Sequence, residues 1–579
     1  MERNTTKKEK SRLAHTVGSA VPYVKKYWVT AAAILAAIAS FAICLYYILG
    51  PSEGYLHSDC TDSLYWANAT VESGSILDEN YRYAAILPFS SSVWFVPLIL
   101  MFGFSMKAQL IGMSIFLVLF TASIYFMCRS MKWSIASTCG MISALLLMLS
   151  GSDKLREIMW GHVIYYSLGL LILFTGLGLA LRFMNNLDTD KPKTVRLAVY
   201  AALLLVLFAG NGTNGFQLIV ISTLPILGAI VAERLLDGKT PLLSRKNLSP
   251  CATVLLIGLA TVVGMALLNV IKGDKIANYT SVYSTLSATS AWVDNLLKFP
   301  NSFFTLLGAE ISAGAELFDK ATVFALVKLI GGLLILVFPV IMLCRYKTLK
   351  DRGTRLLLWA HIVTTAVILF GFVVGKLSNA NWRLVPMVGT GIAATVAGIK
   401  ELIDARHEAK AKGSTAENTS SYNASVRLGV LLLLVCVLFC TVNFYEIKKM
   451  PADYGRENTV HLLTKALEER GLEYGYATFW YSQAITLLSD SQVRVRETLV
   501  KNTGVITDYY QSSKLWYETQ EGIDEYFILL TQKEYATVMG SAYWQEITRE
   551  HLTEQFQPIN GFFVFVFDEN VILKGEFNG

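Results

Sequence analysis

Two carboxylates stand close together just after the first apolar segment of the chain. Asp59 and Asp62 are three residues apart, so they share one face if this stretch is helical. His57 precedes them, and Tyr65 and Trp66 follow with the amphipathic rings that are common at membrane–water interfaces. Such a pair could provide a general base or bind a divalent cation. The alternative interpretation is that these are solvated loop acids beside aromatic residues that merely mark an interface.

Two more polar residues of the same loop could contact a substrate. Glu79 and Tyr81 lie further along, ahead of the apolar stretch 93–103. Taken alone, they are equally typical of a turn or a solvated surface. The stretch 93–103 is interrupted by Pro97 and is too short to cross a bilayer, so it predicts an interfacial or re-entrant segment.

Three basic residues stand where an anion could bind. Lys107, His162 and Arg383 lie at or near the first residues of predicted membrane spans. A helix N-terminus has free N–H groups and the positive end of the helix dipole, which suits an anion at the depth of the lipid headgroups. Arg383 lies beside Trp382, an arrangement that favours a phosphate clamp over simple snorkelling to the interface.

Other basic residues have simpler interpretations. Lys154 and Arg156 are expected to pair locally with Asp153 and Glu157. Lys328 lies inside a predicted span but near its end, so it is expected to snorkel to the surface.

The elements that must position these groups are membrane helices. The chain has 579 residues, of which 53% are hydrophobic and only 16% charged, and its mean hydropathy is +0.45. A soluble protein carries about 25% charged residues, so a soluble chain of this size is excluded. Eleven runs come close to the length that crosses about 30 Å of hydrocarbon: 28–49, 107–128, 134–150, 163–181, 197–210, 216–232, 252–271, 322–343, 356–374, 384–399 and 428–444.

The basic residues predict the orientation of these spans. Lys and Arg accumulate in cytoplasmic loops, and here 27 of them lie on the side of the N-terminus against nine in the loops of the other side. The segment 1–27 is therefore predicted to be a cytoplasmic basic arm, followed by a transmembrane domain over 28–445. The long loops 50–106 and 272–321 are predicted to lie outside, and long ordered loops are more often functional than accidental.

The last part of the chain has the composition of a soluble domain. Residues 446–579 contain 12 basic and 20 acidic residues. Their periodicity predicts a small extracytoplasmic α/β domain, with a helix over 459–470 and strands over 474–478, 492–496, 526–530 and 562–567.

Several function classes are excluded. A net charge of +6, dispersed along the chain, is too weak for a nucleic-acid partner. Of the eight cysteines only Cys60 is predicted to face outside, so no disulfide framework is expected. The sequence has no HExxH motif and no P-loop, which argues against a zinc hydrolase and an ATP-driven pump.

The order of these features resembles the GT-C superfamily, membrane glycosyltransferases such as protein O-mannosyltransferases and aminoarabinose transferases. The motif HxDxxDxxYWA that begins at His57 looks like the first outer loop of bacterial members, and NWRLVP from Asn381 is similar to an Arg-containing entry to a late span. YATFW from Tyr476 looks like the outer domain of uncharacterised bacterial members. Better-known families carry an adjacent Asp-Glu pair in this loop, whereas Asp59 and Asp62 have no neighbouring Glu.

The resemblance implies a fold and an activity. The fold would be an α-helical polytopic membrane protein with about eleven spans and the small α/β domain. The enzyme would move a hexosyl or pentosyl group from a polyprenyl-phosphate-linked sugar to a glycan, glycolipid or protein acceptor of the cell envelope. Asp59 or Asp62 would be the general base, with a preference for Asp59. The donor phosphate would bind Arg383, His162 or Lys107, and the candidate substrate contacts are His57, Tyr65, Tyr81 and Glu79.

Two other classes stay open. A lipid-linked sugar flippase or other transporter would need polar residues along a path at mid-membrane, whereas the polar groups here gather at the predicted outer surface. A non-catalytic envelope assembly protein would depend on the C-terminal domain and not on Asp59. The resemblance places the chain in a bacterial plasma membrane. No cofactor follows with certainty, and a divalent cation is an open option.

Overall fold

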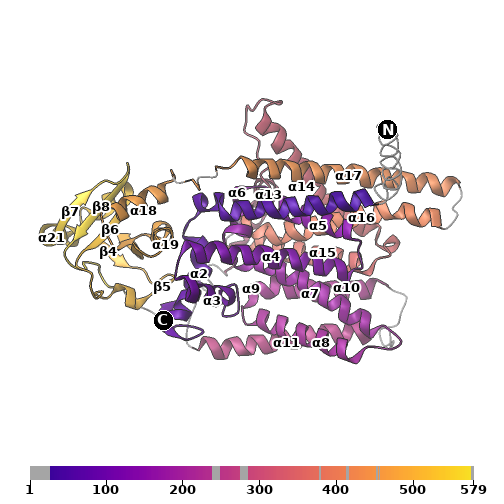
Figure 1. Cartoon of the computed structure of the whole chain (residues 1–579), viewed down its shortest axis with the longest axis horizontal. Helices are drawn as coiled ribbons and strands as arrows, with labels where there is room; N and C mark the ends of the chain where they lie inside the picture. Colours follow the sequence, from indigo (N-terminus) through magenta and orange to yellow (C-terminus); the bar gives the residue numbers. More distant parts are fainter. Residues whose placement is uncertain are drawn as a thin grey trace, which may run out of the picture.

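A bundle of long apolar helices makes up most of the molecule, and a small sheet domain covers one of its ends (Figure 1). The computed structural model describes residues 27–237, 248–273, 285–376, 380–411, 416–451, 454–455 and 457–575. The predicted basic arm lies outside these residues except for its last one. Within them, ten helices are long and apolar enough to cross a membrane, or up to eleven if one bent pair counts as a span. The predicted fold class is therefore confirmed.

The ten helices follow the predicted runs closely. In chain order their bounds are Tyr27–Leu49, Met106–Ser130 (α4), Tyr165–Leu187 (α7), Thr194–Gly212 (α8), Phe216–Leu236 (α9, η4 and most of α10), Leu248–Lys272 (α11), Lys320–Cys344 (α14), Arg352–Val374 (α15), Asn381–Asp404 (η8 and most of α16) and Asn423–Lys449 (in α17).

The third predicted span, 134–150, differs from the structure. Helix α5 (Ile135–Met148) is too short to cross alone, and after a break the chain turns by 116° into Asp153–Gly161. The break occurs because Ser152 begins a new helix, its side chain accepting a hydrogen bond from the backbone N–H of Leu155. After the bend come the short helix α6 (Asp153–Arg156) and a π-helical turn, η3 (Glu157–Gly161). We call α6 and η3 together the broken helix.

Helices α7 and α16 (Val385–Ala411) are the most deeply buried of the spans. Their contact is close because α16 carries glycine at the interface: a Cβ atom added to Gly389 would lie 2.6 Å from Leu170 of α7.

The position of the Lys328 side chain, on α14, differs from the sequence prediction. The side chain is buried instead of snorkelling, and its Nζ donates to the carbonyl of Gly151 and lies 2.7 Å from Glu446.

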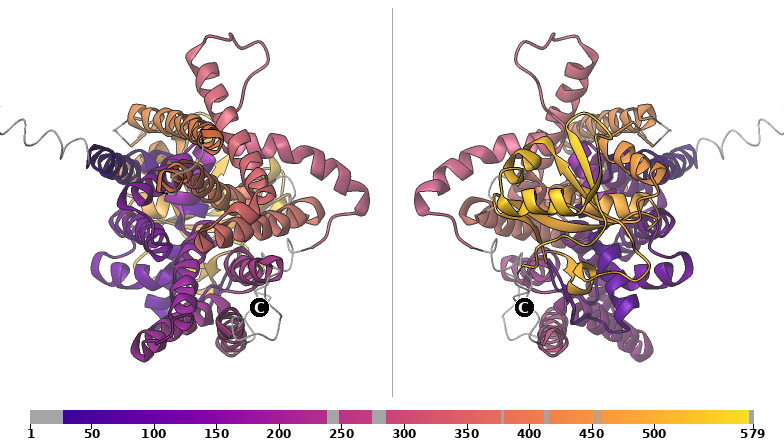
Figure 2. Two further views of the ribbon diagram at one scale, coloured as in Figure 1. Left: turned by 90° about the vertical axis from the view of Figure 1, so that its right-hand side faces the viewer. Right: turned by 90° about the vertical axis from the view of Figure 1, so that its left-hand side faces the viewer.

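The C-terminal domain is an α/β fold around a mixed six-stranded sheet (Figure 2). The strand order is β4-β3-β2-β6-β8-β7, in which β2 is parallel to both neighbours and the other pairs are antiparallel. The strands are β2 (Tyr474–Ala477), β3 (Arg494–Lys501), β4 (Gly504–Thr507), β6 (Tyr526–Thr531), β7 (Leu552–Phe556) and β8 (Phe562–Phe567). The helices are α18 (Thr459–Glu469), α19 (Phe479–Leu488), α20 (Gln532–Val538) and α21 (Ala542–Glu550). The helix and four strands predicted from periodicity lie where α18, β2, β3, β6 and β8 are found.

The long loop 50–106 joins the bundle to this domain. It contains the short helix η2 (Ser58–Thr61), then α2 (Asp62–Ser73), strand β1 (Tyr81–Arg82) and the apolar helix α3 (Ser92–Phe102). Strand β1 pairs with β5 (Ser512–Ser513) of the C-terminal domain. This loop and residues 457–575 cover one end of the bundle. We call it the capped end.

Candidate active site

A cavity of about 1020 Å³ lies at the capped end, between the loop 50–106, the broken helix and the C-terminal domain. Its volume is at the upper end of the range for small-molecule sites. Five carboxyl groups line it: Asp59, Asp62, Glu157, Glu497 and Asp508. Three basic or imidazole groups do so too: His57, Lys154 and His162. The apolar wall is largely aromatic, with Trp66, Trp382, Phe479, Trp480 and Tyr510 among its members. Aromatic faces and carboxylates together suit a polar ligand with an apolar face, such as a sugar.

The two acids predicted as catalytic have different environments. Asp59 lies in η2 and is half-buried, whereas Asp62 begins α2 and is only 7% exposed. Burial raises the pKa of Asp62 well above its ordinary value, and the neighbouring charge of Asp59 adds to this. The side chain of Gln511 donates a hydrogen bond of 2.6 Å to Asp62 and acts in the opposite direction. The more accessible acid is therefore Asp59.

Gln511 connects the first loop to the C-terminal domain. Its side chain is fully buried and also accepts a hydrogen bond of 2.8 Å from the indole N–H of Trp66. Its backbone carbonyl accepts hydrogen bonds from the Tyr81 hydroxyl, at 2.7 Å, and from the side-chain amide of Gln483. Gln511 has φ of +53°, a left-handed conformation that costs a non-glycine residue free energy. Its position is therefore imposed by the surrounding contacts, and it fixes Asp62 from the opposite domain.

Glu157 of the broken helix lies close to the three basic or imidazole groups of the cavity. Its carboxylate lies 2.5 Å from Lys154 Nζ, 3.4 Å from His57 Nε2 and 3.8 Å from His162 Nε2. Burial alone would lower the pKa of His57, but contacts with Cys60 and Glu157 raise it above its ordinary value. The Nζ atom of Lys154 also lies 5.2 Å from the ring centroid of Trp382. This wall of the cavity is the one suited to an anion.

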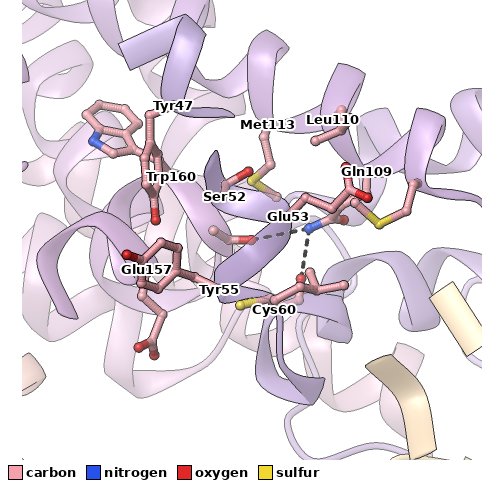
Figure 3. Close-up of a pocket in the computed structure, with 13 residues that line it drawn as sticks. Tyr47, Ser52, Glu53, Tyr55, Cys60, Gln109, Leu110, Met113, Glu157 and Trp160 are labelled. Carbon is pink, nitrogen blue, oxygen red and sulfur yellow. Dashed lines mark hydrogen bonds between the residues drawn. The ribbon is translucent and has the colours of Figure 1, made fainter. Parts of the chain in front are cut away.

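A second, much smaller cavity lies behind this wall (Figure 3). Its volume is about 20 Å³, enough for about one water molecule and far too small for a substrate. Beside it, the side chain of Gln109 donates hydrogen bonds to the backbone carbonyls of Cys60 and Gly161, at 2.9 and 3.2 Å. Gln109 thereby holds η2, which carries Asp59, against the end of the broken helix.

The structure brings some of the sequence-predicted residues together. Asp59, Asp62, His57 and His162 all line the large cavity. The expected local pairing of Lys154 with Glu157 is present, and that of Arg156 with Asp153 as well.

Other predicted residues lie apart from the cavity lining. Tyr65 and Tyr81 are buried behind it, each packing against the ring of Trp516. Glu79 is exposed. Lys107 lies over the ring of Phe102, and the guanidinium of Arg383 extends toward Gly375, where an added Cβ would lie 3.1 Å from Nη1.

Sequence reasoning missed several residues of the cavity. The sequence predicts only local pairing for Lys154 and Glu157, and it predicts no site role for Trp480, Glu497 and Asp508. Glu497 carried a signal, because it occupies the buried register of β3 that Val495 also occupies. A carboxyl group at an inward strand position is unusual unless it has a partner or a function.

Among the described residues, no group of three or more His, Cys, Asp or Glu side chains is arranged to hold a metal ion. The divalent cation stays a sequence prediction.

The long apolar helices and the C-terminal domain together form a polytopic membrane fold, and it is GT-C-like by its similarity to a solved structure. A structure with this fold is ArnT from Cupriavidus metallidurans bound to undecaprenyl phosphate, to which the chain is similar with a TM-score of 0.50. The match covers 94% of this chain and 98% of that chain at 12% sequence identity.

The apo oligosaccharyltransferase from Archaeoglobus fulgidus matches with a TM-score of 0.47 and 12% identity, over 92% of this chain and 74% of that chain. No family model and no curated protein matches the sequence. The match to ArnT shows the fold alone.

Proposed function

We propose that this protein is a membrane glycosyltransferase that moves a sugar from a polyprenyl-phosphate-linked donor to an acceptor hydroxyl at the capped end. The observation that carries the proposal is the 1020 Å³ cavity, in which carboxylates, aromatic rings and a basic wall meet where the bundle ends. The likeness to ArnT, which was solved with undecaprenyl phosphate bound, supports the lipid-linked donor. The acceptor would be a glycan, glycolipid or protein of the cell envelope.

In the proposed reaction Asp59 is the general base. The acceptor oxygen attacks the anomeric carbon, the bond from that carbon to the phosphate oxygen breaks, and the acceptor proton passes to the Asp59 carboxylate. A positioned base contributes roughly 10²–10⁴ in rate. Asp62 is the less suitable base because it is buried and already accepts a hydrogen bond from Gln511.

The departing phosphate needs positive charge at the membrane end of the cavity. Lys154 and His162 line the cavity on the broken helix and the residue after it, so they are proposed to contact this phosphate. Fixed charges aimed at the developing phosphate charge are often the largest catalytic contribution. Arg383 and Lys107 are further candidates for contacts with this phosphate. Their side chains now lie by Gly375 and over Phe102, so they would have to turn toward the donor when it binds.

The proposal includes an orientation. The capped end, with the C-terminal domain, faces the outside of a bacterial plasma membrane, and the N-terminus lies in the cytoplasm. The excess of Lys and Arg in the loops of the opposite side supports this orientation.

The test is transfer of label from undecaprenyl-phosphate hexoses and pentoses, radiolabelled on the sugar, to a cell-envelope glycan, glycolipid and protein fraction in proteoliposomes. We expect transfer by the wild type, a loss of about 100-fold or more in Asp59→Asn and a loss of tenfold or more in Lys154→Ala. The control is Glu525→Gln, an exposed acid of the C-terminal domain outside the cavity lining. Full activity of Asp59→Asn would refute the assignment of the base, and absence of wild-type transfer with every hexose and pentose donor would refute the function.

A further inference from the structure

A second pair of acids, on the C-terminal domain, has no role in the reaction described above. Glu497 lies on β3 and Asp508 follows β4, and they face each other because Thr498 of β3 is paired with Thr507 of β4. The backbone N–H of Asp508 donates to the carbonyl of Glu497, at 3.4 Å, which continues the ladder by one step. Like charges directly opposite each other on two strands are destabilising. Both side chains line the large cavity.

Glu497 is also deeply buried. Its side chain is 3% exposed, and its Oε2 atom has no hydrogen-bond partner among the described residues. A buried carboxyl oxygen without a partner costs about 1–3 kcal/mol, so a purely structural role does not explain it. The Tyr517 hydroxyl fixes the pair, since it donates to the backbone carbonyls of both Glu497, at 2.7 Å, and Asp508, at 2.5 Å.

The protonation of the pair suits hydroxyl groups. Burial raises the pKa of Glu497 well above its ordinary value, and the neighbouring Asp508 adds to this. Burial also raises the pKa of Asp508, although hydrogen bonds from the Tyr510 backbone N–H and from the Glu497 side chain lower it, as do the charges of Arg82 and Lys501. Glu497 then carries the proton and donates it in a hydrogen bond to the Asp508 carboxylate, and the remaining oxygens of the two groups can accept hydrogen bonds from hydroxyls. Two hydroxyls on adjacent carbons of a sugar ring match this set, since each hydroxyl both donates and accepts.

Aromatic rings stand beside the two acids. Trp480 and Tyr510 line the same cavity, and the indole of Trp480 is 56% exposed although it is large and apolar. Its ring centroid lies 6.0 Å from that of His57, on the loop that carries Asp59. An indole face open to a cavity can pack against the apolar face of a pyranose ring while carboxyl groups bind the hydroxyls at its edge.

We propose that Glu497 and Asp508, together with Trp480, form a subsite for an acceptor saccharide. The ring would be held by the C-terminal domain, whereas Lys154 and His162 belong to the broken helix and the residue after it. This inference rests on the proposed function and narrows it: the sugar is transferred to a glycan or glycolipid, and not to a protein side chain. The acceptor hydroxyl would then point toward Asp59.

The test is direct binding, which does not require turnover. The full-length protein in nanodiscs is studied by saturation-transfer NMR with methyl α-pyranosides of glucose, galactose and mannose, and with N-acetylthreonine methylamide as the protein-like comparison. We expect saturation of the ring protons of at least one glycoside and none of the threonine derivative. Glu497→Gln with Asp508→Asn should weaken binding roughly tenfold or more, the loss of one or two buried hydrogen bonds. Trp480→Ala should weaken it as well, and Glu525→Gln should not.

Unfolding controls and outcomes separate this inference from the proposed function. The double variant should unfold at the wild-type temperature or higher, because the substitutions replace two carboxyl groups whose charged forms are disfavoured by burial with neutral amides of the same shape; a large drop would indicate a structural role and overturn the inference. Equal glycoside binding in wild type and double variant would also overturn it, as would no glycoside binding or equal binding of the threonine derivative. Absence of sugar transfer in proteoliposomes would refute the proposed function alone. The saccharide subsite is tested separately, because glycoside binding is measured without turnover.

Discussion

Replacing Gln511 with Met tests whether the two domains share one site. The substitution keeps the length of the side chain but removes the bond to Asp62, at 2.6 Å, and the bond from Trp66, at 2.8 Å. A hydrogen bond to a charged group is worth about 1.5–3 kcal/mol and a neutral one about 0.5–1.5 kcal/mol, so the junction should lose about 2–4 kcal/mol. The loss should be local, because few other contacts depend on this side chain.

The effect should depend on pH in a defined direction. The pKa of Asp62 is raised in the folded protein, so its contribution to stability is present at low pH and is lost as the pH rises through that raised pKa. The bond from Gln511 lowers this pKa, so Gln511→Met raises it further and penalises the charged form more. The deficit should therefore be larger near pH 8 than near pH 5.

The assay is amide hydrogen exchange of the segments 58–66 and 508–513, corrected for intrinsic rates. A loss of about 2–4 kcal/mol corresponds to exchange that is roughly 30- to 1000-fold faster near pH 8. Gln492→Met is the matched control, since Gln492 is exposed on the same domain. Unchanged exchange in these segments, or an increase that is the same at both pH values, would refute the reasoning.

Three further substitutions test other parts of the structure. Glu157→Gln should lower the rate of sugar transfer tenfold or more, because the carboxylate that gathers three basic groups loses its charge; unchanged transfer rates would contradict this role. Lys328→Met should destabilise the bundle by about 1–3 kcal/mol, and adding Glu446→Gln should recover part of that loss in thermal unfolding, whereas additive losses would exclude coupling. Gly389→Ala should cost about 1–3 kcal/mol by overpacking against α7, while Gly140→Ala, where an added Cβ meets nothing within 4 Å, should cost nothing measurable.

The membrane fold could be predicted because its main signal is local. A run of about twenty apolar residues has few alternatives to a span, and the ten long helices follow those runs closely. The break after α5 could not be found this way. It depends on Ser152, a polar residue beyond the predicted run 134–150 that caps a new helix, and a count of apolar residues does not detect such a cap.

The site could be predicted only in part, for a related reason. His57, Asp59 and Asp62 are neighbours in sequence, so their type and spacing already indicated a cluster. Gln511 is a neutral amide without any local motif, and only the closure of the C-terminal domain on the first loop brings it to Asp62. Arg383 illustrates the converse: its place at a helix N-terminus was visible, but the direction of its side chain, toward Gly375, was not.

The pairing of β1 with β5 has a consequence for biosynthesis. Tyr81 and Gln511, joined by a hydrogen bond, are 430 residues apart in the chain. At about 5–20 residues per second, ribosomes need roughly 20 to 90 s to make the intervening polypeptide. During that time β1 and the buried face of α2 await a partner that has not been synthesised. A nascent chain stopped before residue 511 would therefore present an incomplete cavity and an unpaired strand edge, which quality-control proteases could distinguish from the finished protein.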